Sequence, residues 1–126
     1  MLKLTMLVRR APQLSHMEFD HHWRTTHAAL VREHAEVLHI RRYIQTAPLE
    51  NAGLQEALRA GRGALPADYD GCAELWWDSL EDHRAARETP EGLAALQALI
   101  ADEKQFVDLT RSHLWYGTER EIVPLR

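Results

Sequence analysis

The helix candidate that begins near Ser15 carries the residue most suited to proton transfer, His27. Ser15 and Glu18 have the spacing of a capping box, so the helix is expected over about residues 15–36. At about 100° per residue, one third of its circumference collects the side chains of Phe19, Trp23, His27, Leu30, Val31, His34 and Leu38. A histidine on this apolar face has an ordinary pKa of about 6.5, which suits acid–base chemistry. The alternative is a core histidine with one satisfied hydrogen bond.

The other histidines do not form a metal-binding pattern. His34 lies two turns from His27, about 10 Å along a straight helix, and no His-x-x-His or His-x-x-x-His spacing occurs. Most are expected on the surface, with His22 at the rim of the apolar arc. His113, beside Trp115 in the last apolar segment, is a candidate second imidazole for a pocket, or else an exposed strand residue. We expect no metal ion.

The four tryptophans can line an aromatic substrate pocket, or they can pack in the core and in a dimer interface. Trp76 and Trp77 are adjacent, so in a strand they point to opposite faces of the sheet. Trp23 shares the helix face of His27. We select Trp23 and Trp76 as candidate substrate contacts, the alternative being core and interface packing.

Composition limits the function classes. The chain has 126 residues, 45% of them apolar, and a net charge of −4, which offers no basic field for nucleic acid or anionic lipid. A single cysteine, Cys72, excludes an intrachain disulfide and favours a reducing cytoplasm and a buried, inert thiol. No signal peptide or membrane-length apolar run is present, nor any glycine-rich phosphate loop or Rossmann fingerprint. We therefore expect a small-molecule substrate and no nucleotide cofactor.

The elements that must position these residues follow from periodicity and from cap and turn signals. Strands are expected over residues 2–8, 39–47, 72–77 and 112–118, and further helices over 80–87 and 90–109. The helix over 90–109 shows an apolar stripe of Leu93, Leu96, Ile100 and Val107, with Leu99 and Phe106 at its edges. Residues 49–68 form an inserted helical or loop excursion in a single domain of residues 1–126.

The resulting order is β-α-β-β-α-β, the unit of ferredoxin-like α+β folds, with four antiparallel strands and helices on one face. Apolar residues occur on both faces of several strands. A second subunit is therefore expected to cover the open face of the sheet.

Four motifs in this order resemble the EthD-like family of dimeric α/β-barrel proteins, over about residues 2–118. They are Ser15-x-x-Glu18-Phe19 with Trp23 and His27, Arg42-Tyr43-Ile44-Gln45, Tyr69-Asp70-Gly71 leading into Glu74-Leu75-Trp76, and Asp102-Glu103-x-x-Phe106-Val107-Asp108. The resemblance implies a homodimer whose two sheets close into a barrel, with a small pocket between sheet and helices in each subunit. Relatives include muconolactone isomerases, polyketide cyclases, dehydratases and cofactor-independent oxygenases.

The resemblance also implies site residues. His27 matches a histidine that this superfamily often places in the pocket, and Tyr43 matches a tyrosine on the neighbouring strand. Together they provide the base and the hydrogen-bond donor that proton abstraction beside a carbonyl requires. The alternative for Tyr43 is a core aromatic with one backbone partner. Asp102, Glu103 and Asp108 are family features for which we expect a structural role, as salt bridges or caps.

The sequence thus predicts a cofactor-free enzyme that acts by acid–base catalysis on a small aromatic or polyketide-like carbonyl compound. Dehydration, isomerisation and cyclisation share an enolate or enol intermediate, so the lyase and isomerase classes both fit. A cofactor-independent monooxygenase is one alternative. Another is a non-catalytic accessory protein that binds a metabolite, in which His27 only orients the ligand. A haem or metal role lacks any ligand spacing.

Overall fold

Four strands form one antiparallel sheet in the computed structural model, which describes residues 1–126. The strands are β1 (Leu2–Val8), β2 (Arg42–Thr46), β3 (Gly71–Trp77) and β4 (His113–Thr118), in the spatial order β2-β3-β1-β4. β1 pairs with β3 and β4, and β2 pairs with β3. The expected ferredoxin-like α+β fold is confirmed.

The two faces of the sheet differ because side chains alternate along each strand. In β1, Met6 and Val8 are buried toward the helices, whereas Lys3 and Thr5 lie on the opposite face. In β3, Ala73, Leu75 and Trp77 join the same core. The hydrophobic effect on this one face fixes the register of the sheet.

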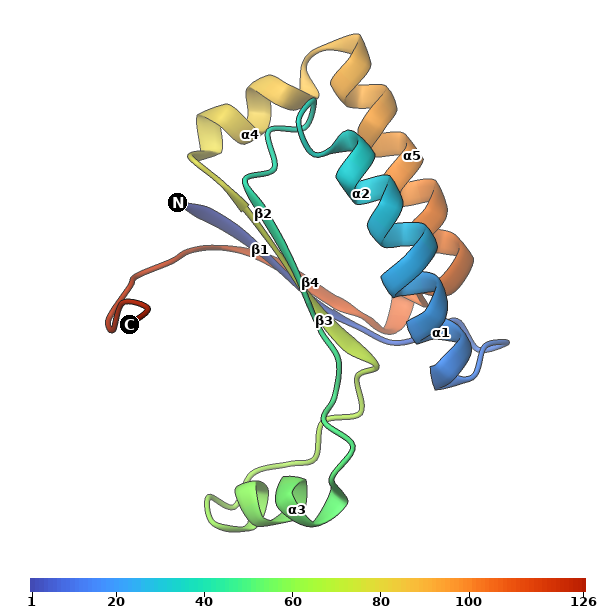
Figure 1. The fold of residues 1–126 in the computed structure, drawn as a ribbon, viewed down its shortest axis with the longest axis vertical. Coiled ribbons are helices and arrows are strands. Elements are labelled where there is room, and N and C mark those ends of the chain that lie inside the picture. Colours follow the sequence, from blue (N-terminus) through green and yellow to red (C-terminus); the bar gives the residue numbers. More distant parts are fainter.

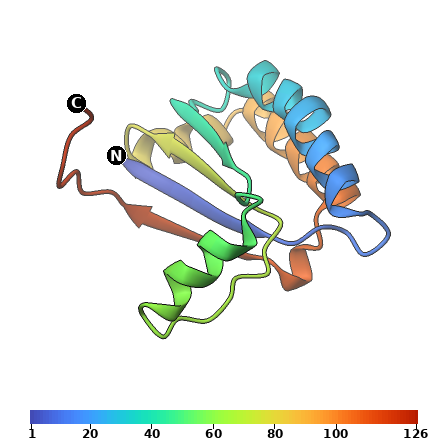
Figure 2. The same cartoon turned by 60° about the horizontal axis from the view of Figure 1, so that its bottom comes forward.

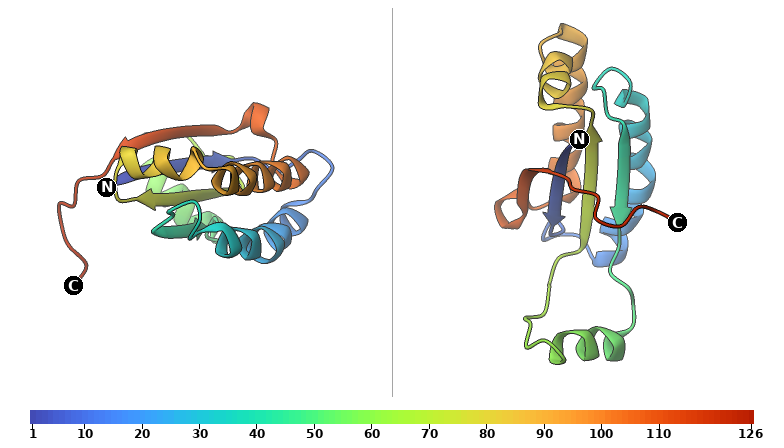
Figure 3. Two further views of the ribbon diagram at one scale, coloured as in Figure 1. Left: turned by 90° about the horizontal axis from the view of Figure 1, so that it is seen from above. Right: turned by 90° about the vertical axis from the view of Figure 1, so that its left-hand side faces the viewer.

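Helices cover that one face of the sheet (Figure 1). The covering helices are α1 (His16–His22), α2 (Ala28–His34), α4 (Leu80–Arg87) and α5 (Pro90–Phe106). None of the helices combines the length and the apolar run needed to cross a membrane. The open face of the sheet is seen in Figure 3, where the chain beyond β4 crosses in front of the strands.

The first helix contains an irregular turn that ends at its buried histidine, His27. Ser15 caps the start, its hydroxyl accepting from the Glu18 amide at 3.1 Å while the Glu18 carboxylate accepts from the Ser15 amide at 2.9 Å. Between α1 and α2 the segment Trp23–His27 forms a π-helical turn, in which the Ala28 amide donates to the carbonyl of Trp23. Such wider turns break the 3.6-residue period and are frequent at functional sites. The expected helix is therefore present, but its two halves are offset.

The buried face of α5 differs from the expected stripe by one position. Leu93 is 47% exposed and Ile100 36% exposed, so the stripe through these residues was wrong. The residues that α5 buries are Gly92, Ala95, Leu99 and Phe106. This face is turned by about 100° from the expected one, and it brings Asp102 and Glu103 toward the first helix.

The segment between β2 and β3 extends away from the rest of the fold. It contains α3 (Ala52–Ala60), which has no buried residue. Figure 1 shows α3 well beyond the strand ends, and in Figure 2 it comes toward the viewer. A hollow of about 640 Å³ separates this segment from the ends of the strands. The helical part of the expected excursion over residues 49–68 is thus present.

Candidate functional site

A small cavity of about 40 Å³ lies between the helices and the sheet. Three of its lining residues can exchange protons: His27, Tyr43 and Glu103. The other lining residues are apolar and come from β1, β3 and the helices: Met6, Val8, Trp23, Val31, Ala73, Leu75, Leu99, Phe106 and Val107. A space of this size holds a water molecule or a small group of substrate atoms.

His27 is the last residue of the π-helical turn and its side chain is only 7% exposed. Its Nδ1 lies 2.8 Å from Oδ2 of Asp102 on α5. Because an ionised carboxylate only accepts hydrogen bonds, Nδ1 carries the proton and Nε2 is the basic nitrogen. Burial lowers the pKa of His27, and Asp102 opposes that effect. His27 is therefore a neutral base at neutral pH, in a fixed tautomer.

Asp102 also binds a second imidazole, that of His22. Nε2 of His22 lies 3.0 and 3.1 Å from the two carboxylate oxygens. His22 is 28% exposed and His27 is nearly buried, although both rings pack on Phe106, with centroids 4.6 and 5.0 Å away. Asp102 thus connects the cavity to a histidine at the surface.

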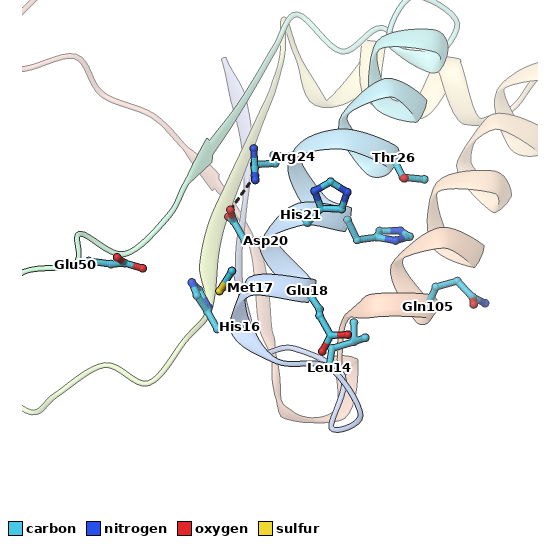
Figure 4. Close-up of a pocket in the computed structure, with 11 residues that line it drawn as sticks. Leu14, His16, Met17, Glu18, Asp20, His21, Arg24, Thr26, Glu50 and Gln105 are labelled. Carbon is cyan, nitrogen blue, oxygen red and sulfur yellow. Dashed lines mark hydrogen bonds and ion pairs between the residues drawn. The ribbon is translucent and has the colours of Figure 1, made fainter.

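His22 borders a polar hollow of about 710 Å³ on the outer side of α1. Figure 4 shows the side chains that line it, with His21 and the Arg24–Asp20 ion pair on the first helix and Gln105 on α5. Only two of its eleven lining residues are hydrophobic. Ligand sites are mostly apolar with a few convergent polar groups, so the small cavity and not this hollow is the candidate site.

Glu103 differs from its neighbour Asp102, since it lines the cavity and its carboxyl group receives no hydrogen bond. Burial, together with the nearby charge of Asp102, raises the pKa of Glu103 to about 7. A carboxyl group that titrates near neutral pH can both donate and accept a proton during catalysis. The expected salt bridge is found for Asp102 but not for Glu103, which lines the cavity instead.

Tyr43 reaches the same cavity from β2. Its hydroxyl oxygen accepts a hydrogen bond from Nε2 of Gln45 at 3.0 Å, and the same amide donates to the carbonyl of Trp23 at 2.9 Å. Burial raises the pKa of Tyr43. Because Gln45 occupies an acceptor position, the phenolic proton remains free to be donated into the cavity.

The sequence-predicted residues divide between the two faces of the sheet. His27, Tyr43 and Trp23 meet at the cavity. Trp76 lies on the opposite face, where its indole nitrogen donates to Glu119 at 2.7 Å. His113 is exposed on that same face, with Nδ1 2.7 Å from the hydroxyl of Tyr69. The expectation that Trp76 and His113 line the pocket of His27 is therefore not met.

Sequence reasoning missed that Glu103 lines the cavity and that Asp102 binds both His22 and His27. The two carboxylates are more than 70 residues from His27 in the chain. Besides the family motif, the signal for their position was the buried stripe of α5, which passes directly through this pair when it is read from Gly92 instead of Leu93.

Comparison with known proteins identifies the family. The sequence profile described as "EthD domain" matches residues 11–110, which include both histidines, Tyr43, Asp102 and Glu103. The chain belongs to the EthD domain family. A search of curated proteins found no significant match to this EthD domain.

Solved structures resemble this EthD domain over almost its whole length. An EthD-family protein of Bacillus halodurans is 22% identical, with 95% of this chain and 99% of that chain covered and a TM-score of 0.62. An EthD-like protein of Ralstonia eutropha is 17% identical, with 97% and 92% covered and a TM-score of 0.59. A dimeric ferredoxin-like protein of unknown function from Bacteroides fragilis is 14% identical, with 92% and 93% covered and a TM-score of 0.55. At these identities the likeness shows the fold alone.

Proposed function

We propose that this EthD domain is a cofactor-free enzyme that moves protons on a small carbonyl compound, by dehydration, isomerisation or cyclisation. The observation that supports the proposal is the convergence of His27, Tyr43 and Glu103 on one otherwise apolar cavity. Groups with shifted pKa values that share a cavity are typical of acid–base sites. Burial lowers the pKa of His27 and raises the pKa of Glu103, so both favour the neutral form. A two-step proton transfer requires such a pair, with His27 as the base and Glu103 as the acid.

The first step removes a proton from the carbon next to the carbonyl group. Nε2 of His27 takes this proton, the C–H electron pair becomes a carbon–carbon double bond, and the carbonyl π electrons move to oxygen. The hydroxyl of Tyr43 donates a hydrogen bond to that oxygen. A single such donor in a closed site contributes about 3–4 kcal/mol to the transition state.

The second step uses the neutral form of Glu103. It donates its proton to another carbon in an isomerisation, or to a departing hydroxyl group, which leaves as water in a dehydration. His27 is then protonated and Glu103 ionised, and transfer of one proton between them restores the starting state. Because the pKa of Glu103 is about 7, both forms are populated at neutral pH.

Product analysis with a panel of hydroxylated aromatic and polyketide-like carbonyl compounds tests this function. We expect the wild type to convert a compound that His27→Ala binds but converts at least ~100-fold more slowly. Glu103→Gln and Tyr43→Phe keep the size of the side chain and are expected to lose activity while remaining folded. His21→Ala, which changes an exposed residue, is the control. Equal conversion by wild type and His27→Ala would contradict the assignment of His27 as the catalytic base.

The same assay separates the alternatives. A metabolite-binding accessory protein would bind a compound that neither wild type nor His27→Ala converts. A cofactor-independent monooxygenase would consume molecular oxygen during conversion, which an oxygen electrode records. Conversion in the absence of oxygen would favour proton transfer over oxygenation.

Our proposal includes a homodimer formed through the open face of the sheet. Trp115 is 50% exposed on β4, and Leu7 and Ile44 lie on the same face of β1 and β2. The related structure from Bacteroides fragilis is described as dimeric. We expect light scattering to give twice the chain mass for the wild type and a shift toward the monomer for Trp115→Glu. A monomeric wild type at micromolar concentration would contradict this part of the proposal.

A further inference from the structure

A groove of about 290 Å³ lies outside the cavity, between α2 and β2. Val31 and Tyr43 line both the groove and the cavity, so these two side chains form the wall between them. β2 is an edge strand of the sheet, and no further strand closes this side. The groove is therefore the outer space directly adjoining the site.

The groove is positively charged in a protein whose net charge is −4. It is lined by Arg32, Arg41 and Arg42 and by no acidic residue. The guanidinium of Arg42 stacks on Trp76 at 4.8 Å, and Arg41 forms an exposed ion pair with Asp78 at 3.3 Å. Arg32 forms no ion pair, which leaves its guanidinium available for a ligand.

The volumes of the cavity and the groove also indicate that one ligand needs both spaces. The cavity alone is far smaller than the roughly 300–1,000 Å³ typical of small-molecule sites. Groove and cavity together reach the lower end of that range. The groove adjoins the cavity at Val31 and Tyr43 and has room for the part of a substrate that the cavity cannot hold.

We infer that the groove between α2 and β2 is the outer half of the substrate site, where Arg32 binds the carboxylate of an organic acid whose carbonyl end enters the cavity. The inference rests on the proposed function and narrows its substrate class from a carbonyl compound to an anionic one. Guanidinium and carboxylate groups form paired, parallel hydrogen bonds that fix orientation as well as charge. Arg41 is the second, weaker source of positive charge, because Asp78 competes for it.

Binding of two matched probes tests the inference without any turnover. 4-Formylbenzoate and 4-formylbenzamide carry a carbonyl group at one end of an aromatic ring and differ only in the carboxylate or amide at the other end. The carbon beside the aldehyde bears no hydrogen in either compound, so enolisation cannot convert them. The methyl resonances of Val31 in NMR spectra report on both spaces. We expect 4-formylbenzoate to shift them and to bind about five-fold more tightly than the amide at low ionic strength. Salt at about 500 mM is expected to remove most of this preference.

Variants assign the preference to one side chain. Arg32→Gln is expected to bind both probes equally, Arg32→Lys to keep part of the preference, and Asp78→Asn to increase it by freeing Arg41. Arg84→Gln, an exposed arginine of α4 outside the groove, is the control and is expected to behave as wild type. Equal affinity of the wild type for both probes, an unchanged preference in Arg32→Gln, or binding that leaves Val31 unshifted overturns the inference. Absence of turnover with any compound would instead count against the proposed function.

Discussion

At the scale of single residues, Asp102 has the unusual position of a carboxylate shared by two imidazoles. It lies 2.8 Å from Nδ1 of His27 and 3.0 Å from Nε2 of His22. One negative charge can balance only one imidazolium, so protonation of either ring opposes protonation of the other. The charge of the surface histidine therefore reaches the buried base through Asp102.

The variant His22→Gln tests this coupling. We expect the pKa of His27 to rise, because a protonated His22 lowers it in the wild type and because Asp102 then serves His27 alone. An NMR titration of the histidine ring protons measures the change directly. His21→Gln removes an exposed neighbour that does not touch Asp102, and is expected to leave His27 unchanged. An unaltered titration of His27 in His22→Gln would show that the two rings are independent.

The sequence predicts site residues that lie on one helix better than contacts between residues far apart in the chain. His27 and Trp23 were predicted from one helix and its period, and both line the cavity. Glu103 was expected in a structural role as one of three acidic family features, and a helical wheel of α5 alone cannot show that it lines a cavity formed with other elements. Trp76 was assigned to the wrong face, since alternation fixes that Trp76 and Trp77 face opposite ways but not which way each faces.

At the scale of elements, the corner between α4 and α5 depends on a glycine. A Cβ atom at Gly92 would lie 1.6 Å from the carbonyl oxygen of Ala86. Gly92 and Ala86 are both buried, and this contact sets how closely the two helices meet. The position of the corner in turn fixes the direction of α5, which carries Asp102 and Glu103.

Gly92→Ala is accordingly expected to destabilise the fold by about 2–3 kcal/mol, because backbone and not a flexible side chain has to move. Chemical denaturation monitored by tryptophan fluorescence measures the loss. Gly53→Ala makes the same change in the exposed helix α3, where the nearest atom is 3.9 Å away. That variant is expected to stay within about 0.5 kcal/mol of wild type. Similar stability of the two variants would argue against a close contact at Gly92.

The order and type of the elements follow from the sequence more fully than their ends do. Capping signals placed the starts of the first helix, α4 and α5 correctly, since Ser15, Ser79 and Thr89 each cap a helix amide. The second strand begins at Arg42 and not at residue 39, because His39 adopts φ 59° and ends the preceding helical segment. A π-helical turn leaves no capping or turn signal, and the periodicity of the first helix did not reveal it.

At the scale of the whole molecule, two buried groups oppose each other in their pH dependence. Glu103 has a pKa of about 7, raised by burial, and His83 has a pKa of about 4, lowered by burial. His83 packs between Trp77 and Tyr116, and its Nδ1 has no hydrogen-bond partner. Folding therefore favours the neutral form of both groups.

The sign of each contribution follows from which state binds more protons. Between pH 4.5 and 7 the folded chain holds the proton of Glu103 more tightly than the unfolded chain, so stability falls as pH rises. Between pH 6.5 and about 4 the unfolded chain binds a proton at His83 that the folded chain excludes, so stability falls as pH decreases. These two contributions largely cancel between pH 4.5 and 6.5, and the lowered pKa of His27 leaves a stability that falls as the pH decreases through this range.

Glu103→Gln removes the contribution of Glu103 to the pH dependence of stability. We expect the variant to gain stability over wild type by on the order of 2 kcal/mol at pH 8 and by much less at pH 4.5. Urea denaturation across this pH range provides the measurement. Glu33→Gln changes an exposed glutamate and serves as the control. A constant difference between Glu103→Gln and wild type at all pH values would contradict the assigned titration.

The π-helical turn at Trp23–His27 inserts one extra residue into the first helix, compared with a regular α-helix. Deleting a residue there would restore ordinary α-helical hydrogen bonds, and it would rotate the half before the turn by about 100° against the half after it. Phe19, which is fully buried, would leave the core, or else Val31 would. The half before the turn has to bury Phe19 and the half after it has to bury Val31, and the extra residue allows both. Insertions and deletions should consequently be far less tolerated at these five residues than in the excursion that carries α3.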